Sequence, residues 1–365
     1  MKITLFGLTL SSSWGNGHAT PYRALLRALH RRGHDLVFYE RDVEYYRHRR
    51  DFSTCDFCRL ELYSFWEEAR TRALRDVASS DVVVVGSYCP EGARINDDLL
   101  AVAAPLHVFY DLDTPITLAN LERGDLDYLR REQLPQFDLV LSFTGGEILQ
   151  QLENRWGVRR ARPVYGCVDP EVHRRVAANA EFACGLSYMG TYAADRQHKV
   201  DELFLEPARR MEATGFVLAG SLYPWNWRWP ENVRIFEHVA PTEHAQLYSS
   251  SRLTLNITRD GMARYGYCPS GRFFEAAACG TPIVTDTWPG LETFFTPGEE
   301  LFTASAADEV VAALQTSDEV LARVARRARE RTLSEHTGDQ RAEAMLRYFE
   351  EAVASSQSPV ASSHG

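Results

Sequence analysis

The stretch best suited to binding a charged ligand is residues 265–286, which reads as loop, helix, tight turn and strand. Gly271 lets the backbone approach a ligand closely, and Ser270 is a favourable N-cap for the helix that follows. Gly280 is placed to end that helix in the left-handed conformation. A loop that opens onto a helix N-terminus presents unpaired N–H groups and a partial positive charge, which suits an anion such as a diphosphate.

Glu275 lies about one turn into this predicted helix. A carboxylate at that place can accept hydrogen bonds from a vicinal diol, such as the two hydroxyls of a ribose. Phosphate donors and a ribose acceptor within one turn indicate a nucleotide site. The alternative is an ordinary capped helix with an exposed glutamate, and this stretch alone does not separate the two.

A second candidate centre is His18, in the loop after the first predicted strand. Thr20 and Pro21 form an N-cap and N1 pair, which predicts a helix start at this point. His18 lies just before that helix, beside Gly15 and Gly17, where the helix dipole disfavours the imidazolium and keeps the ring neutral. A neutral imidazole at the edge of a cleft suits a general base near pH 7. The alternative is a capping or packing role.

The second-half stretch resembles a known family. Residues 272–286, Arg-Phe-Phe-Glu-Ala-Ala-Ala-Cys-Gly-Thr-Pro-Ile-Val-Thr-Asp, are similar to the nucleotide-sugar helix of GT-B glycosyltransferases, in particular the CgeB-like branch of the group 1 superfamily. The resemblance implies that Glu275 holds the ribose of the sugar donor. Many members carry a second acid eight residues earlier, where this chain has Tyr267. The retaining mechanism that often accompanies the pair of acids is therefore not implied directly.

The first-half loop resembles the acceptor loop of inverting GT-B enzymes, through Gly-His-x-x-Pro after the first strand and Arg-Gly-His at the next. The resemblance implies that His18 deprotonates the acceptor hydroxyl and that an aspartate after a later strand steadies it. Asp111, which ends a predicted strand, is the first candidate partner. Asp113 is the second, because it can instead cap the helix that begins at Pro115. The acceptor-loop candidates are Trp14, Gly15, Asn16 and Gly17.

Cationic and backbone groups elsewhere in the second half complete the predicted donor site. Arg196 follows Gly190 and Thr191, whose N–H groups can face a phosphate. Cations assist a diphosphate leaving group because its charge grows as the glycosidic bond breaks. Arg259 and Arg272 can reach the same phosphates. The remaining candidates are Lys199 for the phosphates, Asp260 for the sugar hydroxyls, and His238 and Val239, which the resemblance places against the nucleobase through backbone groups.

Several of these assignments have plain structural alternatives. Lys199 can belong to a surface turn, and Arg259 with Asp260 can form a surface ion pair. The tryptophans of residues 225–229 can stack on a base or sugar. Because prolines flank them, they can instead hold a loop to the core.

Two other classes of protein compete with a glycosyltransferase. Gly15 and Gly17 supply two of the three glycines of a dinucleotide-binding fingerprint, and Glu40 ends the second predicted strand where a ribose-binding acid can stand. That pattern would fit an NAD(P)-dependent oxidoreductase, but it leaves the second-half motif unexplained. A non-catalytic protein that binds a nucleotide sugar on a transferase scaffold is the other alternative.

Length and composition limit the choice of class. A chain of 365 residues predicts about two domains. A net charge of −10 and a pI near 5.6 argue against a nucleic-acid partner, which favours a basic face. We expect a cytoplasmic protein, since no apolar run has the length of a membrane span and no signal peptide is evident.

No metal or cofactor is predicted besides the nucleotide-sugar co-substrate. Cys55 and Cys58 have zinc or redox spacing, but no second Cys/His pair stands at a suitable distance. Reduced thiols are therefore expected for the seven cysteines. Asp111 and Asp113 have the spacing of an acidic metal motif but lie in the acceptor half of the chain.

The arrangement of apolar segments predicts an α/β protein. Continuous apolar runs fit parallel strands buried on both faces, and the segments between them are long enough for crossover helices. The predicted strands are 2–10, 35–40, 81–86, 106–111 and 138–143 in the first half and 183–190, 216–221, 233–239, 253–258 and 282–285 in the second.

The sequence thus predicts the GT-B fold, with two Rossmann-like doubly wound domains and a cleft between them. A helix near the end has an apolar stripe of Ala342, Met345, Leu346, Phe349 and Val353. The predicted divisions are an acceptor-binding domain over 1–175, a nucleotide-sugar-binding domain over 176–335, a helix that crosses back over 336–354, and a disordered tail over 355–365.

The predicted reaction moves a sugar from a nucleoside diphosphate to an acceptor hydroxyl. His18 is the expected base, which favours inversion at the anomeric carbon, and no metal is required. The acceptor is expected to be a small molecule, a glycan or a peptide.

Overall fold

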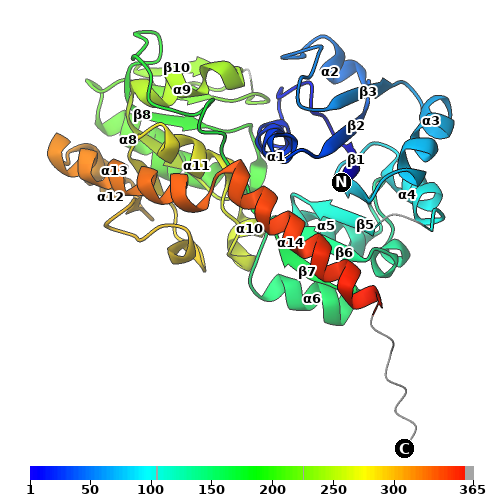
Figure 1. Cartoon of the computed structure of the whole chain (residues 1–365). Helices are drawn as coiled ribbons and strands as arrows, with labels where there is room; N and C mark the ends of the chain where they lie inside the picture. Colours follow the sequence, from blue (N-terminus) through cyan, green and yellow to red (C-terminus); the bar gives the residue numbers. More distant parts are fainter. Residues whose placement is uncertain (104–105, 225, 358–365) are drawn as a thin grey trace, which may run out of the picture.

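The computed structural model of the chain describes residues 1–103, 106–224 and 226–357. Its strands form two β-sheets, each flanked by helices (Figure 1). The strands of the first sheet are β1 (Lys2–Gly7), β2 (Asp35–Arg41), β3 (Arg59–Tyr63), β4 (Val82–Gly86), β5 (Leu106–Asp111), β6 (Leu139–Ser142) and β7 (Ala161–Pro163). Those of the second are β8 (Cys184–Met189), β9 (Phe216–Ala219), β10 (Val233–Phe236), β11 (Ser251–Asn256), β12 (Ile283–Thr285) and β13 (Phe302–Thr303).

Both sheets are parallel and doubly wound, as predicted. The first has the order β3-β2-β1-β4-β5-β6-β7 and the second β10-β9-β8-β11-β12-β13. Central strands such as β4 are buried along their whole length, which explains why continuous apolar runs identified them. The sequence did not predict β3, β7 or β13, and all three are edge strands. An edge strand pairs on one side only, and these three are short or rich in polar residues, so they lack the apolar run of a central strand.

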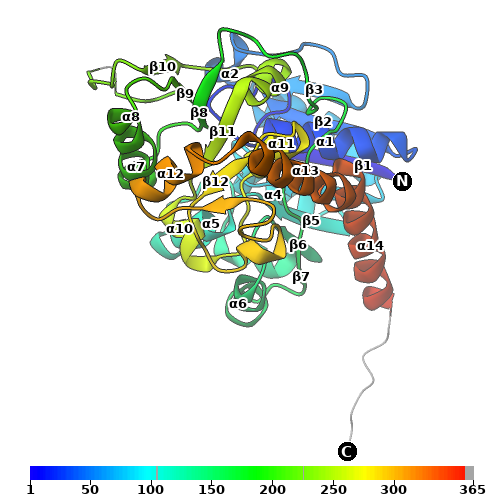
Figure 2. The ribbon, with the colours of Figure 1, turned by 90° about the vertical axis from the view of Figure 1, so that its left-hand side faces the viewer.

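Helices cover both faces of each sheet (Figures 1 and 2). In the first domain they are α1 (Ala19–Arg31), α2 (Glu44–Arg47), α3 (Trp66–Ala78), α4 (Gly92–Leu100), α5 (Thr114–Arg123) and α6 (Glu147–Trp156). In the second they are α7 (Gln197–Val200), α8 (Glu206–Arg210), α9 (Pro241–Ser250), α10 (Asp260–Tyr265), α11 (Gly271–Ala278), α12 (Ala307–Leu314) and α13 (Asp318–Glu335). The last helix is α14 (Gly338–Gln357).

Helix α14 leaves the second domain and lies along the first, where it packs against α1 (Figure 1). Ala342, Met345 and Phe349 are almost completely buried in the core of the first domain. Gly338 is required at the crossing, because a Cβ there would stand 2.4 Å from the carbonyl oxygen of Ala24. The predicted stripe extends one residue too far, since Val353 is 43% exposed.

The helix also runs further than predicted. Residues 355–357 are helical instead of belonging to the tail, and residues 358–365 lie outside the described part of the chain. Among the described residues, no helix combines the length and the apolar character that crossing a bilayer requires.

Candidate functional site

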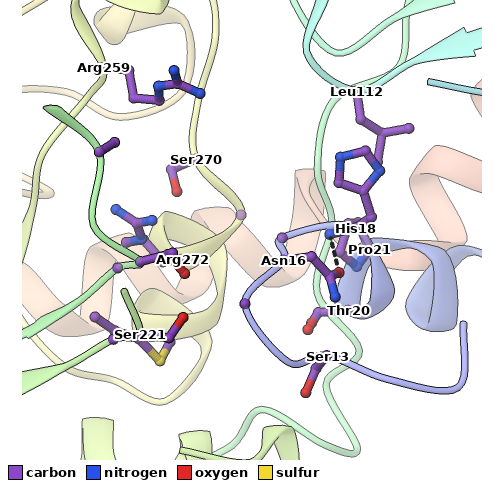
Figure 3. Close-up of a pocket in the computed structure, with 18 of the residues that line it drawn as sticks. Ser13, Asn16, His18, Thr20, Pro21, Leu112, Ser221, Arg259, Ser270 and Arg272 are labelled. Carbon is purple, nitrogen blue, oxygen red and sulfur yellow. Dashed lines mark hydrogen bonds between the residues drawn. The ribbon is translucent and has the colours of Figure 1, made fainter. Parts of the chain in front are cut away.

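A cavity of about 570 Å³ opens between the carboxyl ends of the strands of the two sheets. Figure 3 shows His18 and Asn16 of the first domain facing Ser270 and Arg272 of the second across this space. Open α/β sheets bind ligands at this edge. The predicted site residues that line the cavity are Gly15, Asn16, Gly17, His18, Asp113, Gly190, Thr191, Arg196, His238, Val239, Arg259, Ser270, Gly271, Arg272 and Glu275.

Helix α1 begins two residues earlier than the sequence predicts, so that His18 occupies the N-cap position. The helix begins at Ala19, and the Asn16 side chain caps it by accepting hydrogen bonds from the backbone N–H groups of His18 (3.0 Å) and Ala19 (3.2 Å). The prediction that Thr20 is the N-cap is therefore wrong. Asn16 thus fixes the backbone at His18, which is only 6% exposed and borders the cavity.

The carboxylate that pairs with His18 is Asp113, not Asp111. Nε2 of His18 lies 3.0 Å from Oδ2 of Asp113. A carboxylate only accepts, so this contact places a hydrogen on Nε2 and leaves Nδ1 to accept a proton. Within the described part of the chain, Nδ1 has no hydrogen-bond partner.

Asp111 instead supports the turn that presents Asp113. Its Oδ1 accepts hydrogen bonds from Thr117 Oγ1 (2.8 Å) and from the backbone N–H of Asp113 (3.1 Å). It is almost completely buried and does not line the cavity. Burial raises the pKa of its carboxyl from 3.8 to about 7, although the hydrogen bonds from Thr117 and Asp113 oppose the rise.

Positive charge gathers on the second-domain wall of the cavity. Arg196 is 7% exposed and donates to the Thr191 carbonyl, and Arg272 lies over the ring of Tyr188. Among the residues that the structure describes, neither arginine has a carboxylate within ion-pair distance, and Nε of Arg196 and Nη1 of Arg272 have no hydrogen-bond partner. Only Arg259 is paired, with Asp195 at 3.0 Å.

Burial lowers the pKa of Arg196, and the charges of Arg272 and Arg259 lower it further. A buried arginine next to other cations is costly unless an anion binds there. The cluster therefore favours an anionic ligand such as a diphosphate.

Lys199 and Asp260 do not line the cavity. The ammonium of Lys199 donates to Oδ2 of Asp286 (3.1 Å) and to the carbonyl of Thr258 (2.9 Å), and it also lies 3.0 Å from Asp260. Lys199 thereby compensates the buried Asp286. The alternative reading of Arg259 and Asp260 as one surface pair is also wrong, because each pairs with a different residue.

The amino end of α11 faces the cavity beside this cluster. Ser270 occupies the N-cap position, but its side chain makes no capping hydrogen bond and lines the cavity instead (Figure 3). The first N–H groups of a helix have no partner within the helix, and Ser270, Gly271 and Arg272 at this end of α11 line the cavity. Oε1 of Glu275 lies beside Gly271, since a Cβ built there would be in ordinary contact with it at 3.8 Å.

Glu275 is 6% exposed, which excludes the alternative of an exposed helix glutamate. Its Oε2 lies 3.2 Å from Nδ1 of His244 and 3.9 Å from Nε2 of His173, and Tyr248 donates to the same oxygen at 3.5 Å. Burial alone would raise its pKa, but the hydrogen bond and charge of His244, together with His173 and Arg272, hold it at about 2. Glu275 is therefore ionised at neutral pH.

Sequence reasoning missed His173 and His244 as neighbours of Glu275. They come from the segment before β8 and from α9, and neither position is linked to Glu275 by spacing. The ligand atoms of the three side chains lie within 4.8 Å of one another, which is the one grouping of this kind among the described residues that could hold a metal ion.

Tyr267 stands where the second acid of the family motif would be, and it has a structural role. It has a positive φ of 46°, and its carbonyl accepts a hydrogen bond from the backbone of Gly145 at 2.9 Å. Its ring fits between Gly146 and Gly290, where any Cβ would meet the ring within 2.5 Å. The loop before α11 is thereby fixed to both domains.

The dinucleotide reading of the first-half loop is not supported by the position of Glu40. Its side chain is completely buried. Its carboxylate accepts hydrogen bonds from Thr9, from the backbone of Leu10, and from both the backbone and the hydroxyl of Ser11. These bonds leave no free side for a ribose, and Glu40 does not line the cavity.

The aromatic candidates pack mainly against protein. Trp14 lies against His238 of the second domain, with ring centroids 4.7 Å apart, and does not line the cavity. Trp227 and Trp229 pack with Tyr223, and Trp229 also contacts the core of the second domain. These contacts support the reading in which the loop is held to the core. Trp225 lies outside the described residues.

Residues 196–347 match the family model described as glycosyl transferase-like. This part of the chain is similar to glycosyl transferase-like proteins. The match covers α11 and the first half of α14, and it includes most of the predicted donor-site residues. No curated protein matches the chain by sequence.

Solved structures share the fold over almost the whole chain. Sucrose-phosphate synthase from Thermosynechococcus elongatus superposes with a TM-score of 0.69 at 14% identity, covering 97% of this chain and 99% of that one. HepE from Anabaena, in complex with UDP and glucose, superposes with a TM-score of 0.65 at 11% identity, covering 96% of this chain and 100% of that one. An α-glucosyltransferase in complex with UDP-glucose and DNA superposes with a TM-score of 0.72 at 12% identity, covering 96% of this chain and 99% of that one.

The prediction of a GT-B glycosyltransferase is thereby confirmed, with the family model matching the second half and the fold extending over both halves. The CgeB-like branch stays a prediction.

Replacement of Asp111 by Asn tests the structural role of this residue. Asn can accept the same two hydrogen bonds but cannot ionise. Because the folded-state pKa of Asp111 is raised, wild-type stability falls as pH rises from about 4 to about 7, on the order of 1.4 kcal/mol per pH unit within that window. We expect Asp111→Asn to remove this pH dependence. The free energy of unfolding of the variant, measured in urea, should therefore rise relative to that of wild type as pH increases.

The matched control is Asp35→Asn, at an exposed strand end. A stability difference between Asp111→Asn and wild type that does not change from pH 4.5 to pH 6.5 would contradict the assignment.

Proposed function

We propose that this protein transfers a sugar from a nucleoside diphosphate sugar to an acceptor hydroxyl, without a metal and with inversion at the anomeric carbon. The observation that carries the proposal is one cavity with two chemically different walls. The second-domain wall offers Arg196, Arg272, the amino end of α11 and the carboxylate of Glu275. The first-domain wall offers the His18–Asp113 pair.

The second-domain wall matches a nucleoside diphosphate group by group. Two arginines without carboxylate partners and a helix N-terminus suit the diphosphate. Oε2 of Glu275 accepts from the Tyr248 hydroxyl and lies beside His244, while Oε1 lies toward Gly271 and can accept from ribose hydroxyls. UDP is the first nucleotide to try, because HepE and the α-glucosyltransferase are described as complexes with UDP or UDP-glucose.

The first-domain wall supports removal of a proton. In the proposed reaction Nδ1 of His18 takes the proton of the acceptor hydroxyl, and Asp113 stabilises the imidazolium that forms. The acceptor oxygen then bonds to the anomeric carbon while the bond from that carbon to the diphosphate oxygen breaks. The electron pair leaves with the diphosphate, where the arginines and the helix N-terminus stabilise the added negative charge.

A non-catalytic sugar-nucleotide sensor would share the donor wall and lack the need for a proton acceptor. The buried hydrogen bond between His18 and Asp113, placed across the cavity from the donor wall, favours the enzyme. The chemical nature of the acceptor stays open; the net charge of −10 counts against a nucleic acid.

Nucleotide binding tests the donor wall. In a thermal-shift panel we expect UDP, GDP or dTDP to stabilise the protein and NAD to have no effect. A ligand at one hundred times its Kd adds about 2.7 kcal/mol to the free energy of unfolding. Arg272→Met should weaken binding of the active nucleotide about tenfold or more, because charge-assisted hydrogen bonds contribute about 1.5–3 kcal/mol. Arg209→Met, on the exposed side of α8, is the control. Stabilisation by NAD alone would contradict the proposal.

Turnover of a His18→Ala variant tests the base. We expect the rate to fall by about two to four orders of magnitude, with the affinity for the nucleotide unchanged, because His18 lies on the acceptor wall. Asp113→Asn should also slow the reaction, since the imidazolium loses its counter-charge. Near-normal turnover of His18→Ala, or a product with the donor's anomeric configuration in proton NMR, would contradict the assignment.

Chelation tests metal independence. Because Arg196 and Arg272 supply the positive charge that a divalent cation would otherwise bring to the diphosphate, we expect the full rate in excess EDTA. The measurement is initial velocity before and after EDTA treatment, with Mg²⁺ or Mn²⁺ added back. A rate that EDTA abolishes and the cation restores would overturn this part of the proposal.

A further inference from the structure

Two cysteine thiols lie together in the segment that joins α2 to β3 in the first domain (Figure 1). Sγ of Cys55 is 3.1 Å from Sγ of Cys58, and two residues separate them in the sequence. Both are free thiols, and neither lines the cavity between the domains. The pair therefore has no part in the site described above, and its chemistry can be considered separately.

The surrounding chain holds the two sulfurs side by side. Phe57, which lies between them in the sequence, is 4% exposed and belongs to the core of the first domain, against which Cys55 and Cys58 also pack. The start of the segment is fixed by Asp51, whose Oδ2 accepts a hydrogen bond from Arg23 of α1 at 2.7 Å. A small rotation of the two cysteine side chains is then enough to bring the sulfurs to bonding distance.

The two thiols differ in reactivity. The hydrogen bond with Cys58 lowers the pKa of the Cys55 thiol, and backbone hydrogen bonds of Phe57 and Cys58 add to the effect, although burial and the charge of Asp56 oppose it. The same contact, together with burial, raises the pKa of Cys58. The thiolate is the form that attacks a disulfide, so Cys55 is the attacking sulfur. It is half-buried, and its neighbours Thr54 and Asp56 are exposed, so a small molecule can reach it.

A metal site and a purely structural packing role are the alternatives for this pair. Structural zinc requires four ligands, whereas the one grouping of three possible metal ligands among the described residues lies elsewhere, at His173, His244 and Glu275. A packing role requires only small apolar side chains. Two accessible thiols in contact, two residues apart, are instead the arrangement that exchanges readily with other disulfides.

We propose that Cys55 and Cys58 are a redox-active dithiol that closes reversibly to a disulfide by exchange with a low-molecular-weight disulfide. The Cys55 thiolate attacks one sulfur of the external disulfide, whose S–S bond breaks, and the first small thiol leaves with a proton. Cys58 then gives up its proton and attacks Sγ of Cys55, and the second small thiol leaves. Two electrons thus pass from the protein thiols to the external disulfide, which is reduced to two thiols.

The second step should be fast, because the Cys58 sulfur already stands in contact with the sulfur that it attacks. A reaction between groups held in this way has a large advantage over reaction with a molecule from solution. In the wild-type protein the mixed disulfide on Cys55 is therefore expected to be transient.

Mass spectrometry of the reduced, full-length protein after treatment with oxidised glutathione tests this chemistry. We expect the mass to fall by two hydrogen atoms, five of the seven thiols to stay open to alkylation after unfolding, and peptide mapping to join Cys55 to Cys58. Excess reduced glutathione should then restore all seven. Seven free thiols after the treatment, a bond to another cysteine, or a disulfide that excess reduced glutathione does not open would overturn the proposal.

Single variants separate the roles of the two sulfurs. Cys58→Ser keeps a hydroxyl donor beside Cys55 but lacks the second thiol, so one glutathione per chain should accumulate on Cys55. In Cys55→Ser the remaining thiol should react about tenfold more slowly than Cys55 does in Cys58→Ser, because its thiolate fraction is smaller. A packing role would give no such difference. Cys184→Ser, at a half-buried cysteine of the second domain, is the control and should oxidise like wild type.

Two results with these variants would contradict the proposal. One is a stable glutathione adduct on the wild-type protein, since Cys58 would then fail to displace it. The other is an equal rate for the two single variants. Both measurements are independent of nucleotide binding, so they hold whether or not the protein binds UDP.

Discussion

The site depends on one buried ionised carboxylate. Glu275 lies at the base of the cavity, and burial by itself would favour its neutral form. His244, His173 and Arg272 reverse that preference and keep the charge. A carboxylate with one oxygen held by protein and the other turned toward a cavity is prepared to bind a diol. On the same wall, Arg196 and Arg272 carry positive charge that no carboxylate of the described residues compensates. The cavity is thus arranged for a ligand that carries hydroxyls at one end and negative charge at the other.

The fold keeps these groups in place through contacts between its two halves. Tyr267 is fixed by glycines of both domains, and the Thr144 hydroxyl bonds to Cys268 in the same loop. Helix α14 returns to the first domain and buries its apolar side there. The amino end of α11 is therefore positioned with respect to both walls. At Tyr267, where the family motif often has an acid, this chain has a ring that packs at the domain junction.

Much of this could be predicted from local sequence. The alanines and glycines around α11 predicted the helix itself, which the structure contains, and the buried central strands were recognised as apolar runs. The site predictions that were wrong or incomplete depended on contacts between segments that are distant in sequence. Asp111 and Asp113 are both near a strand end, and only the turn geometry decides that Asp113 reaches His18. Lys199 is bound to Asp286, which is remote in sequence. His173 and His244 meet Glu275 through tertiary packing that no spacing reveals.

The most direct test of the central claim is a crystal structure of the protein soaked with UDP. The account predicts the diphosphate between Arg196, Arg272 and the amino end of α11, with the ribose hydroxyls on Oε1 of Glu275. Nucleotide bound in the first domain beside Gly15 and Glu40, or a ribose without contact to Glu275, would contradict it.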